Sequence, residues 1–327
     1  MILAGDVGGT KCNLALFSEK DGQLAPIFRQ RFASKDFSKF ELIVKEFATA
    51  AAPHLNGARI EAAGFGIAGP VINNTVRATN LPWIVEAGNL KEELKVEHIV
   101  LLNDLGAWGH SLEHLPPEDF LVLNQGKPEP GGTRALIAAG TGLGESILFW
   151  QKGRYHVVPS EGGHSDFAPH TDQQIDLLRF MRKRTPQVSW ELILSGRGFR
   201  TLHEFLAPEI KHESFDVPNV DPAPEITKNG LSGACPACVQ VLDLWIAMYG
   251  SEAGNLALKV LALGGVFVAG GIAVKIIEKM KDGSFFKSFK DKWRFEGLLN
   301  NIPVSVILNE SAPLIGAAHE ALAAIDR

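Results

Sequence analysis

The chain has 327 residues, of which 46% are hydrophobic and 21% are charged, and its formal net charge is −5. This composition is ordinary for a globular protein, and the length allows two cores of roughly 100–200 residues each. A mildly acidic chain offers no basic field to nucleic acid, so no nucleic-acid partner is expected.

The N-terminal segment contains no targeting signal. Met1 to Ala4 lead directly into Gly5, without the basic and apolar regions of a signal peptide. No apolar run approaches the roughly 20 residues that a membrane helix needs. The sequence therefore predicts a cytoplasmic protein with no membrane partner.

A glycine-rich turn follows the first apolar segment. Residues 1–17 read as a strand, a polar turn and an alternating strand, which is typical of a hairpin. Glycine lets backbone N–H groups crowd around phosphate oxygens, and nearby hydroxyl and ammonium groups add donors. A carboxylate beside such a turn can hold Mg²⁺, usually through water. The candidate phosphate-binding residues are Gly5, Asp6, Val7, Gly8, Gly9, Thr10 and Lys11, with Asp6 as the candidate Mg²⁺ residue.

The middle of the chain alternates between helical and strand patterns. The predicted elements are a helix over 37–52, a buried strand over 60–67, a turn at Asn73-Asn74, a strand over 96–102 that ends at Asn103-Asp104, and a loop over 126–132. Residues 134–150 then repeat the first hairpin, with Gly140, Thr141 and Gly142 in its turn. This weak internal repeat indicates two related α/β lobes.

The last third contains two further segments that bear on function. A helical region is expected over 235–263, interrupted near Gly250 and Gly254, and a buried strand over 264–271 carries Gly270 and Gly271 at its end. The other predicted elements are helices over 171–184, a proline-rich loop over 217–224, a strand over 304–308 and a terminal helix from about 312.

Two familiar nucleotide motifs do not fit. In a Walker P-loop counted from Gly5, Thr10 stands at the second glycine position and Cys12 at the Ser/Thr position. The Gly-x-Gly-x-x-Gly run over 64–69 is followed by a strand and turn pattern instead of the helix that a dinucleotide fingerprint needs. Hydride transfer is therefore not expected.

The three cysteines are too few for a disulfide framework. Cys12 stands alone, and Cys235 and Cys238 form a Cys-Pro-Ala-Cys pair. A structural zinc site needs four ligands, and no second Cys/His pair follows at a suitable spacing. The pair is therefore interpreted as two cysteines at a helix start, in preference to a zinc or redox motif.

Together these motifs resemble the ATPase fold shared by hexokinase, actin and the Hsp70 chaperones. Within that fold the chain is most similar to bacterial-type glucokinase, because the matching stretches occur in family order along nearly the whole chain. These stretches are Gly5 to Thr10, Leu102 to Asp104, Gly140 to Gly144, Glu161 to Pro169, Glu191 with Leu194 to Gly196, Gly254 to Leu258, and Val266 to Gly271.

The resemblance implies a two-lobed actin-like (ribonuclease H-like) α/β fold with the active site in the interdomain cleft. It implies a small domain of residues 1–110 completed by 303–327, and a large domain of residues 111–302. The implied ligands are ATP, Mg²⁺ and glucose, and the protein is expected to be a homodimer. Lys11 stands where the family commonly has Asn, and the zinc-binding cysteine cluster of the related repressor/kinase group is absent.

Residue roles also follow from the resemblance. Asp104 is expected to be the catalytic base that accepts the proton of the sugar 6-hydroxyl, and Asn103 to bind the sugar beside it. Further sugar-hydroxyl ligands are expected at Glu161, His164 and Glu191. Asn80, before Leu81-Pro82-Trp83, is an additional sugar-side candidate, for which a turn residue is the alternative. For Asp104 the alternative is a helix N-cap, which is common after a strand.

Three other functions are known on the same fold. A sugar-responsive repressor on this fold would need a DNA-binding segment, yet the first motif begins by Gly5. A chaperone-like ATPase would need a long substrate domain after the ATPase. A kinase for another hexose or an amino sugar has the same motifs and stays open.

Overall fold

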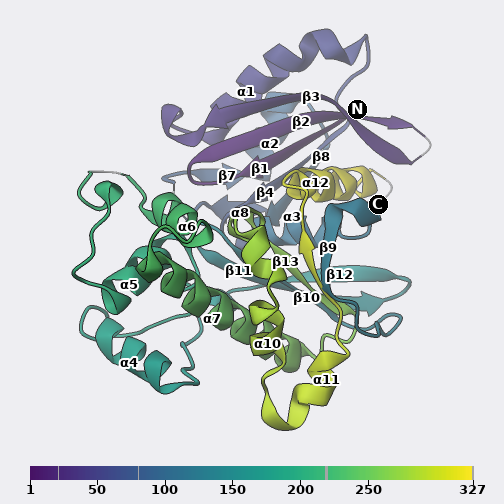
Figure 1. Ribbon diagram of the computed structural model, residues 1–327. Coiled ribbons are helices and arrows are strands. Elements are labelled where there is room, and N and C mark those ends of the chain that lie inside the picture. Colours follow the sequence, from purple (N-terminus) through teal and green to yellow (C-terminus); the bar gives the residue numbers. More distant parts are fainter. Residues whose placement is uncertain (21, 80, 218–219, 326–327) are drawn as a thin grey trace. The chain divides into compact units, whose positions relative to one another are not determined.

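The computed structural model (Figure 1) describes residues 1–20, 22–79, 81–217 and 220–325. Asn80 and residues 218–219 of the predicted loop over 217–224 lie outside the described residues. The chain divides into two compact units, which are described separately. The first comprises Met1–Pro117, Val157–Pro159 and Asn309–Arg327, and the second comprises Glu118–His156 and Ser160–Leu308. The domain limits expected from the sequence, at 110/111 and 302/303, stay a prediction.

The first unit is built on a five-stranded sheet. Strands β1 and β2 form the predicted antiparallel hairpin, and β1, β4 and β8 run parallel, so that their carboxyl ends lie at one edge of the sheet. The sheet order is β3-β2-β1-β4-β8, with β1 Ile2–Val7, β2 Lys11–Lys20, β3 Gln23–Ala33, β4 Ala62–Ile67 and β8 His98–Asn103.

Both faces of this sheet are covered by helices, as the alternation of side chains along β2 shows. Leu14 and Leu16 pack into a core with α1 (Phe40–Ala51) and α2 (Ala87–Leu94). Ala15 and Phe17 point to the other face, into a core with α3 (Asp104–Ser111) and α12 (Ala312–Ala323). Figure 1 shows α1 and α12 on opposite sides of the sheet. The helices predicted over 37–52 and from about 312 are confirmed.

A small three-stranded sheet follows β4 and consists of β5 Val71–Ile72, β6 Thr75–Arg77 and β7 Ile84–Glu86. Asn73 and Asn74 join β5 to β6 with φ of 50° and 56°, the left-handed values of a two-residue hairpin turn. The predicted turn is confirmed, and no helix opens after the Gly-x-Gly-x-x-Gly run. The chain therefore lacks the dinucleotide-binding geometry at this point, as the sequence indicated.

The second unit contains a six-stranded sheet of order β12-β11-β10-β13-β14-β9. Strands β10 and β11 form the second predicted hairpin, and β10, β13 and β14 run parallel. The strands are β9 Phe120–Asn124, β10 Arg134–Ala139, β11 Leu143–Gln151, β12 Arg154–Ser160, β13 Gly265–Ala269 and β14 Val304–Ile307. The predicted strands over 264–271 and 304–308 are thereby confirmed.

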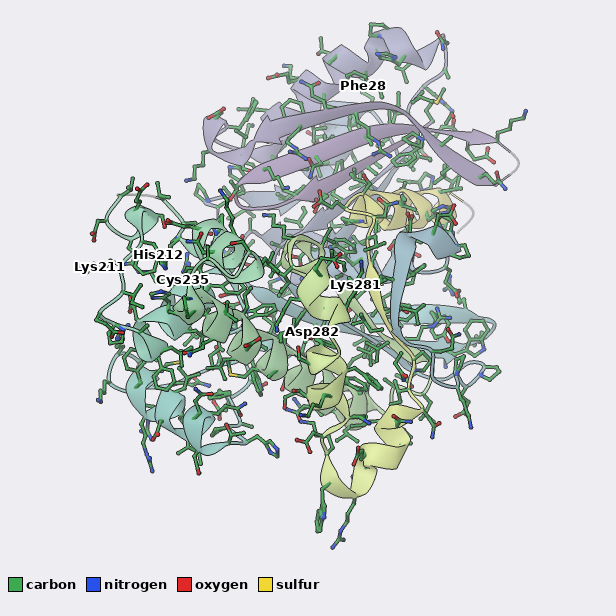
Figure 2. All side chains as sticks on the ribbon, in the orientation of Figure 1. Phe28, Lys211, His212, Cys235, Lys281 and Asp282 are labelled. Atoms are coloured by element: carbon green, nitrogen blue, oxygen red, sulfur yellow. The ribbon has the colours of Figure 1, made fainter. Side chains whose placement is uncertain are left out.

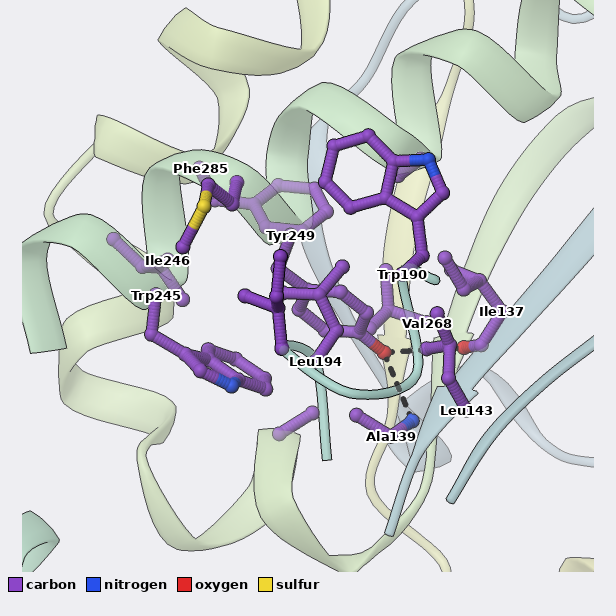
Figure 3. Close-up of a cluster of buried hydrophobic side chains, with 14 of the residues drawn as sticks. Ile137, Ala139, Leu143, Trp190, Leu194, Trp245, Ile246, Tyr249, Val268 and Phe285 are labelled. Carbon is purple, nitrogen blue, oxygen red and sulfur yellow. Dashed lines mark hydrogen bonds between the residues drawn. The ribbon is translucent and has the colours of Figure 1, made fainter. Parts of the chain in front are cut away.

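Helix α7 is the centre of the second core. Its Trp245 and Tyr249 are fully buried among Leu194, Val268 and Phe285 (Figure 3). The helices of this unit are α4 Asp172–Met181, α5 Gly196–Leu206, α6 Ala223–Leu231, α7 Pro236–Val260, α8 Gly271–Lys275, α9 Ile277–Lys281, α10 Ser284–Lys290 and α11 Glu296–Asn300. Among the described residues no single helix is long and apolar enough to cross a membrane, whereas α6 and α7, bent by 101°, together pass that test of length and composition.

The interruption expected near Gly250 and Gly254 is wrong, because α7 is continuous over 25 residues. Both glycines face α10 at very short range. A Cβ atom built on Gly250 would lie 2.1 Å from the Phe285 carbonyl oxygen, and one built on Gly254 would lie 2.2 Å from that of Phe289. The glycines therefore serve close helix packing and do not break the helix.

Replacing Gly250 with Ala should destabilise the second unit. The new methyl group would clash with backbone atoms of Phe285, which cannot rotate away as a flexible side chain could. We therefore expect a loss of about 1–3 kcal/mol of unfolding free energy. The matched control is Gly297→Ala in α11, where a Cβ has no neighbour within 4 Å and helix propensity predicts a gain of up to about 1 kcal/mol. Urea denaturation monitored by tryptophan fluorescence measures both variants against the wild type. A Gly250→Ala midpoint equal to that of the wild type would contradict the packing argument.

Candidate active site

Two sets of hydrogen bonds hold the turn of the first hairpin: one within the turn backbone and one from Ser34. The Gly8 N–H donates to the Lys11 carbonyl oxygen at 3.0 Å. The Ser34 hydroxyl donates to the Gly8 carbonyl oxygen at 2.7 Å, and the Ser34 N–H donates to that of Thr10 at 3.1 Å. Thr10 and Lys11 are exposed and Gly9 is partly so. The polar groups of the turn therefore face solvent, where a phosphate chain can meet them.

Asp6 is a partly buried carboxylate beside this turn. It accepts a hydrogen bond from Asn13 Nδ2 at 3.2 Å, and Arg31 Nε donates to Asn13 Oδ1 at 2.9 Å. Burial raises the pKa of Asp6, while Asn13 and the charge of Lys11 lower it by less. A divalent cation stabilises the ionised form of such a carboxylate, so the donor and its surroundings fit Mg²⁺.

Asn103 and Asp104 lie where β8 ends and α3 begins. Asn103 is the helix cap, because its Oδ1 accepts the Leu105 N–H at 2.9 Å while its Nδ2 donates to the Gly69 carbonyl oxygen at 3.2 Å. Asp104 is the first residue of α3, and its Oδ1 accepts the same N–H at 3.0 Å. The capping role weighed for Asp104 thus belongs to Asn103.

The sheet register brings these residues to the edge that carries the first hairpin. Val7 pairs with Ile67 and Ile67 pairs with Asn103, so three parallel strands end at one level. Side chains at the carboxyl ends of neighbouring parallel strands form the usual ligand site of an open α/β sheet. Asp6 and Asp104 therefore belong to the same edge of the first unit.

The second hairpin has the same construction in the second unit. The Gly140 N–H donates to the Gly142 carbonyl oxygen at 2.8 Å, and the Gly196 N–H donates to that of Gly140 at 2.9 Å. Gly270 lies against the hairpin with φ of 89°, and a Cβ there would be 2.5 Å from the Ala139 carbonyl oxygen. Only glycine fits this place, which joins the end of β13 to the second hairpin.

A buried tyrosine that the sequence reasoning missed fixes the end of β10. The Ala139 N–H donates to the Tyr249 hydroxyl at 3.2 Å, and that hydroxyl donates to the Ile137 carbonyl oxygen at 3.3 Å (Figure 3). Burial strongly raises the pKa of Tyr249, which therefore stays a neutral donor. The available signal was a tyrosine at the end of the apolar run Leu244 to Met248, since a buried phenol needs partners.

Glu161, His164 and Glu191 gather around the start of β11. The His164 Nε2 lies 3.9 Å from a carboxylate oxygen of Glu161 and 3.9 Å from one of Glu191. Glu191 Oε2 also accepts the Leu143 N–H at 3.1 Å, and the Glu191 N–H donates to the Gly163 carbonyl oxygen at 2.9 Å. The structure thus brings three expected site residues together, while their role as sugar ligands stays a prediction.

Glu145 packs against the loop that carries Glu161 and His164, and the sequence patterns did not indicate this role. It is only 2% exposed, and a Cβ on Gly162 would lie 1.9 Å from its Oε2. Burial raises the pKa of Glu145 to about 7, and the nearby Glu252 carboxylate adds to the rise while Lys259 opposes it. The Glu161–His164 loop therefore rests on a carboxyl group that is neutral in mild acid.

Two glycine hairpins at the ends of parallel strands, in two α/β units of this topology, are the architecture of the actin-like ATPase class. A family model described as Glucokinase matches residues 3–324. A curated glucokinase from Synechocystis is 40% identical over 97% of this chain and 96% of its own length. The chain belongs to the glucokinase family.

Solved structures agree with this assignment. The crystal structure of glucokinase from an Antarctic psychrotroph superimposes with a TM-score of 0.83 at 29% identity, covering 98% of each chain. A ROK family glucokinase from Streptomyces griseus, solved with glucose and AMPPNP, has a TM-score of 0.68 at 22% identity and covers 98% of this chain and 99% of its own. The second likeness concerns the fold.

The raised pKa of Glu145 predicts a pH dependence of stability. The folded state holds this proton more tightly than the unfolded chain, so the contribution is complete below about pH 4.5 and is lost as pH rises through about 7. Glu145→Gln, which cannot ionise, should keep that stability. Its thermal midpoint should therefore exceed the wild-type midpoint progressively from pH 5 to pH 8.

The control is Glu278→Gln, because the Glu278 side chain is 75% exposed and pairs only with Lys281 at the surface among the described contacts. Scanning calorimetry across the pH range compares the three proteins. A constant difference between Glu145→Gln and wild type would show that Glu145 does not titrate there.

Proposed function

We propose that this protein transfers the γ-phosphoryl group of ATP to the 6-hydroxyl of glucose, the first step of glucose use in glycolysis. The observation that carries the proposal is Asp104 at the carboxyl end of β8, on the sheet edge that holds the first phosphate-type hairpin. Membership of the glucokinase family supports it, and so do the glucose and AMPPNP bound to the Streptomyces griseus enzyme.

Asp104 acts as the general base. The oxygen of the sugar 6-hydroxyl forms a bond to the γ-phosphorus, and its proton passes to the Asp104 carboxylate. The bond between the γ-phosphorus and the bridging oxygen breaks, and ADP leaves with that electron pair. Phosphoryl transfer depends mainly on positioning and charge neutralisation, so the base adds a part of the rate.

The hairpins bind the phosphates of ATP through backbone N–H groups. In the first hairpin Thr10 and Lys11 add a hydroxyl and an ammonium group, and in the second Thr141 adds a hydroxyl. Gly270 and Gly271 join β13 to α8 and contact the nucleoside; Gly271 leaves room for it, because a Cβ there would have no neighbour within 4 Å. Asp6 holds Mg²⁺, which neutralises phosphate charge when it is bound.

Asn103, Glu161, His164 and Glu191 bind sugar hydroxyls. The two carboxylates accept hydrogen bonds, and His164 donates or accepts one. A sugar with a missing or inverted hydroxyl leaves one of these groups without its partner, which costs binding energy. Because Glu191 also holds the Leu143 N–H, the sugar cluster is tied to the second hairpin.

The substrate is tested by measuring ATP consumption across a panel of hexoses. Glucose should give the highest kcat/KM. Activity on fructose or N-acetylmannosamine without activity on glucose would assign the protein to another sugar and keep the kinase chemistry. ADP and polyphosphate belong in the same panel as alternative donors, where ATP should be preferred.

Replacing Asp104 with Asn removes the base and keeps the shape. We expect kcat to fall by about 10²–10⁴-fold, with glucose binding retained, because general-base catalysis contributes that range. Asp176→Asn, an exposed carboxylate that pairs with Arg179, is the control and should leave kcat unchanged. Turnover near the wild-type rate in Asp104→Asn would remove Asp104 from the mechanism.

We further propose, from the family resemblance, a homodimer that works in the cytoplasm. Analytical ultracentrifugation of the untagged protein should give the mass of two chains. A single-chain mass at micromolar concentration would contradict the dimer.

A further inference from the structure

Four potential metal-ligating side chains converge in the second unit. His203 lies on α5 and His212 on the segment between α5 and α6, while Cys235 caps α7 and Cys238 lies in its first turn. One ligand atom from each of His203, His212 and Cys238 falls within 4.8 Å of the others. Figure 2 labels His212 and Cys235 in the same region of the molecule.

The separations are of the size found between ligands of a tetrahedral zinc ion. The His212 Nε2 lies 3.1 Å from Cys238 Sγ and 3.8 Å from Cys235 Sγ. With Zn–S near ~2.3 Å and Zn–N near ~2.0–2.1 Å, tetrahedral angles place a sulfur and a nitrogen about 3.6 Å apart. The Cys235 separation lies close to this value, and the Cys238 separation is about 0.5 Å shorter, as expected of a hydrogen-bonded pair that an ion between them would move slightly apart.

His203 supplies independent evidence for a ligand. The residue has no exposed surface, and neither of its ring nitrogens has a hydrogen-bond partner. Leaving a buried imidazole nitrogen unsatisfied costs about 1–3 kcal/mol, so such groups are normally paired. The rings of His212 and Phe215 pack against it at centroid distances of 5.0 Å and 4.9 Å, and one of its ring nitrogens lies within 4.8 Å of the ligand atoms of His212 and Cys238.

We propose that His203, His212, Cys235 and Cys238 form a structural Cys₂His₂ zinc site. Two thiolates and two imidazoles in a tetrahedral arrangement are the donor set that selects Zn²⁺ over harder cations. All four positions are filled by protein, which is the mark of a structural instead of a catalytic zinc site. The ion would fix the segment between α5 and α6 to the start of α7.

The ligands also show why the sequence reasoning missed the site. It looked for a second Cys/His pair after Cys238, whereas the pair precedes the cysteines and is separated by eight residues. Only the folding of α5 against α7 brings His203 to Cys238. The cysteines do stand at a helix start, as expected, and Cys238 is fully buried, which keeps its sulfur from exchange with other thiols.

Cobalt(II) is the probe for this site. The untagged full-length protein is dialysed against a chelator under reducing conditions and then titrated with Co²⁺. The expected result is a thiolate-to-cobalt charge-transfer band together with strong d–d bands of tetrahedral cobalt. These bands should saturate at one ion per chain and disappear when Zn²⁺ is added, with zinc in the isolated protein confirmed by mass spectrometry.

Variants locate the ion. Cys238→Ser and His203→Gln should each weaken Co²⁺ binding by about 100-fold or more, since even changes to groups that only support a ligand cost about 10–100-fold. The control is Cys12→Ser, because Cys12 is a buried cysteine of the first unit that bonds to Ser34. If Cys238→Ser fails to fold, the half-buried His212→Ala provides the same test.

Zinc removal should also lower the thermal midpoint of the wild type, because metal binding to the folded state alone adds to stability. The Cys12→Ser control should show the same chelator-induced loss, whereas Cys238→Ser should show none. Absence of the thiolate band in the wild type, or a Co²⁺ affinity in Cys238→Ser equal to that of the wild type, would overturn the proposal. Kinase activity is a separate measurement, so this outcome does not bear on the proposed function.

Discussion

The arrangement of both hairpins depends on close contact between backbone segments at the carboxyl ends of the parallel strands. A phosphate-binding turn presents N–H groups only if no Cβ stands in front of them. At the end of β10 a Cβ on Gly270 would meet the Ala139 carbonyl oxygen at 2.5 Å, and one on Gly163 would meet that of Leu143 at 2.0 Å. Tight backbone contact, secured by glycine, therefore sets both the hairpin and the loop that carries His164.

The same constraint explains the internal repeat. Each unit has an antiparallel hairpin whose first strand is parallel to the next strand of the sheet, β1 with β4 and β10 with β13. The hairpin turn thus falls at the carboxyl end of a parallel strand in both units. What differs is the support: a serine hydroxyl braces Gly8 in the first unit, whereas the Tyr249 hydroxyl holds Ala139 in the second. The repeat conserves where the turn lies and not how it is held.

Local patterns were predictable wherever the chain itself sets the geometry. The hairpins, the Asn73-Asn74 turn and the buried strand β4 follow from alternation and turn chemistry over a few residues. Contacts between distant segments were not predictable, since nothing near Tyr249 shows that it meets Ala139, and nothing near His203 shows that it meets Cys238. The helix interruption predicted at Gly250 and Gly254 was wrong for the same reason. These glycines allow close packing against α10, a contact that the local sequence does not reveal.

The helices that carry the four Cys and His ligands are also the helices that hold the second hairpin. Helix α5 begins at Gly196, whose N–H binds the Gly140 carbonyl oxygen, and carries His203 two turns later. Helix α7 begins at Pro236, directly after its N-cap Cys235, and contacts Ala139 through the Tyr249 hydroxyl. An ion bound by His203 of α5 and by Cys235 and Cys238 at the start of α7 would therefore connect the two helices. These helices make the two contacts that hold the second hairpin, from Gly196 to Gly140 and from Tyr249 to Ala139. The packing of α5 against α7 thus determines both the geometry of the Cys/His cluster and the position of the second hairpin.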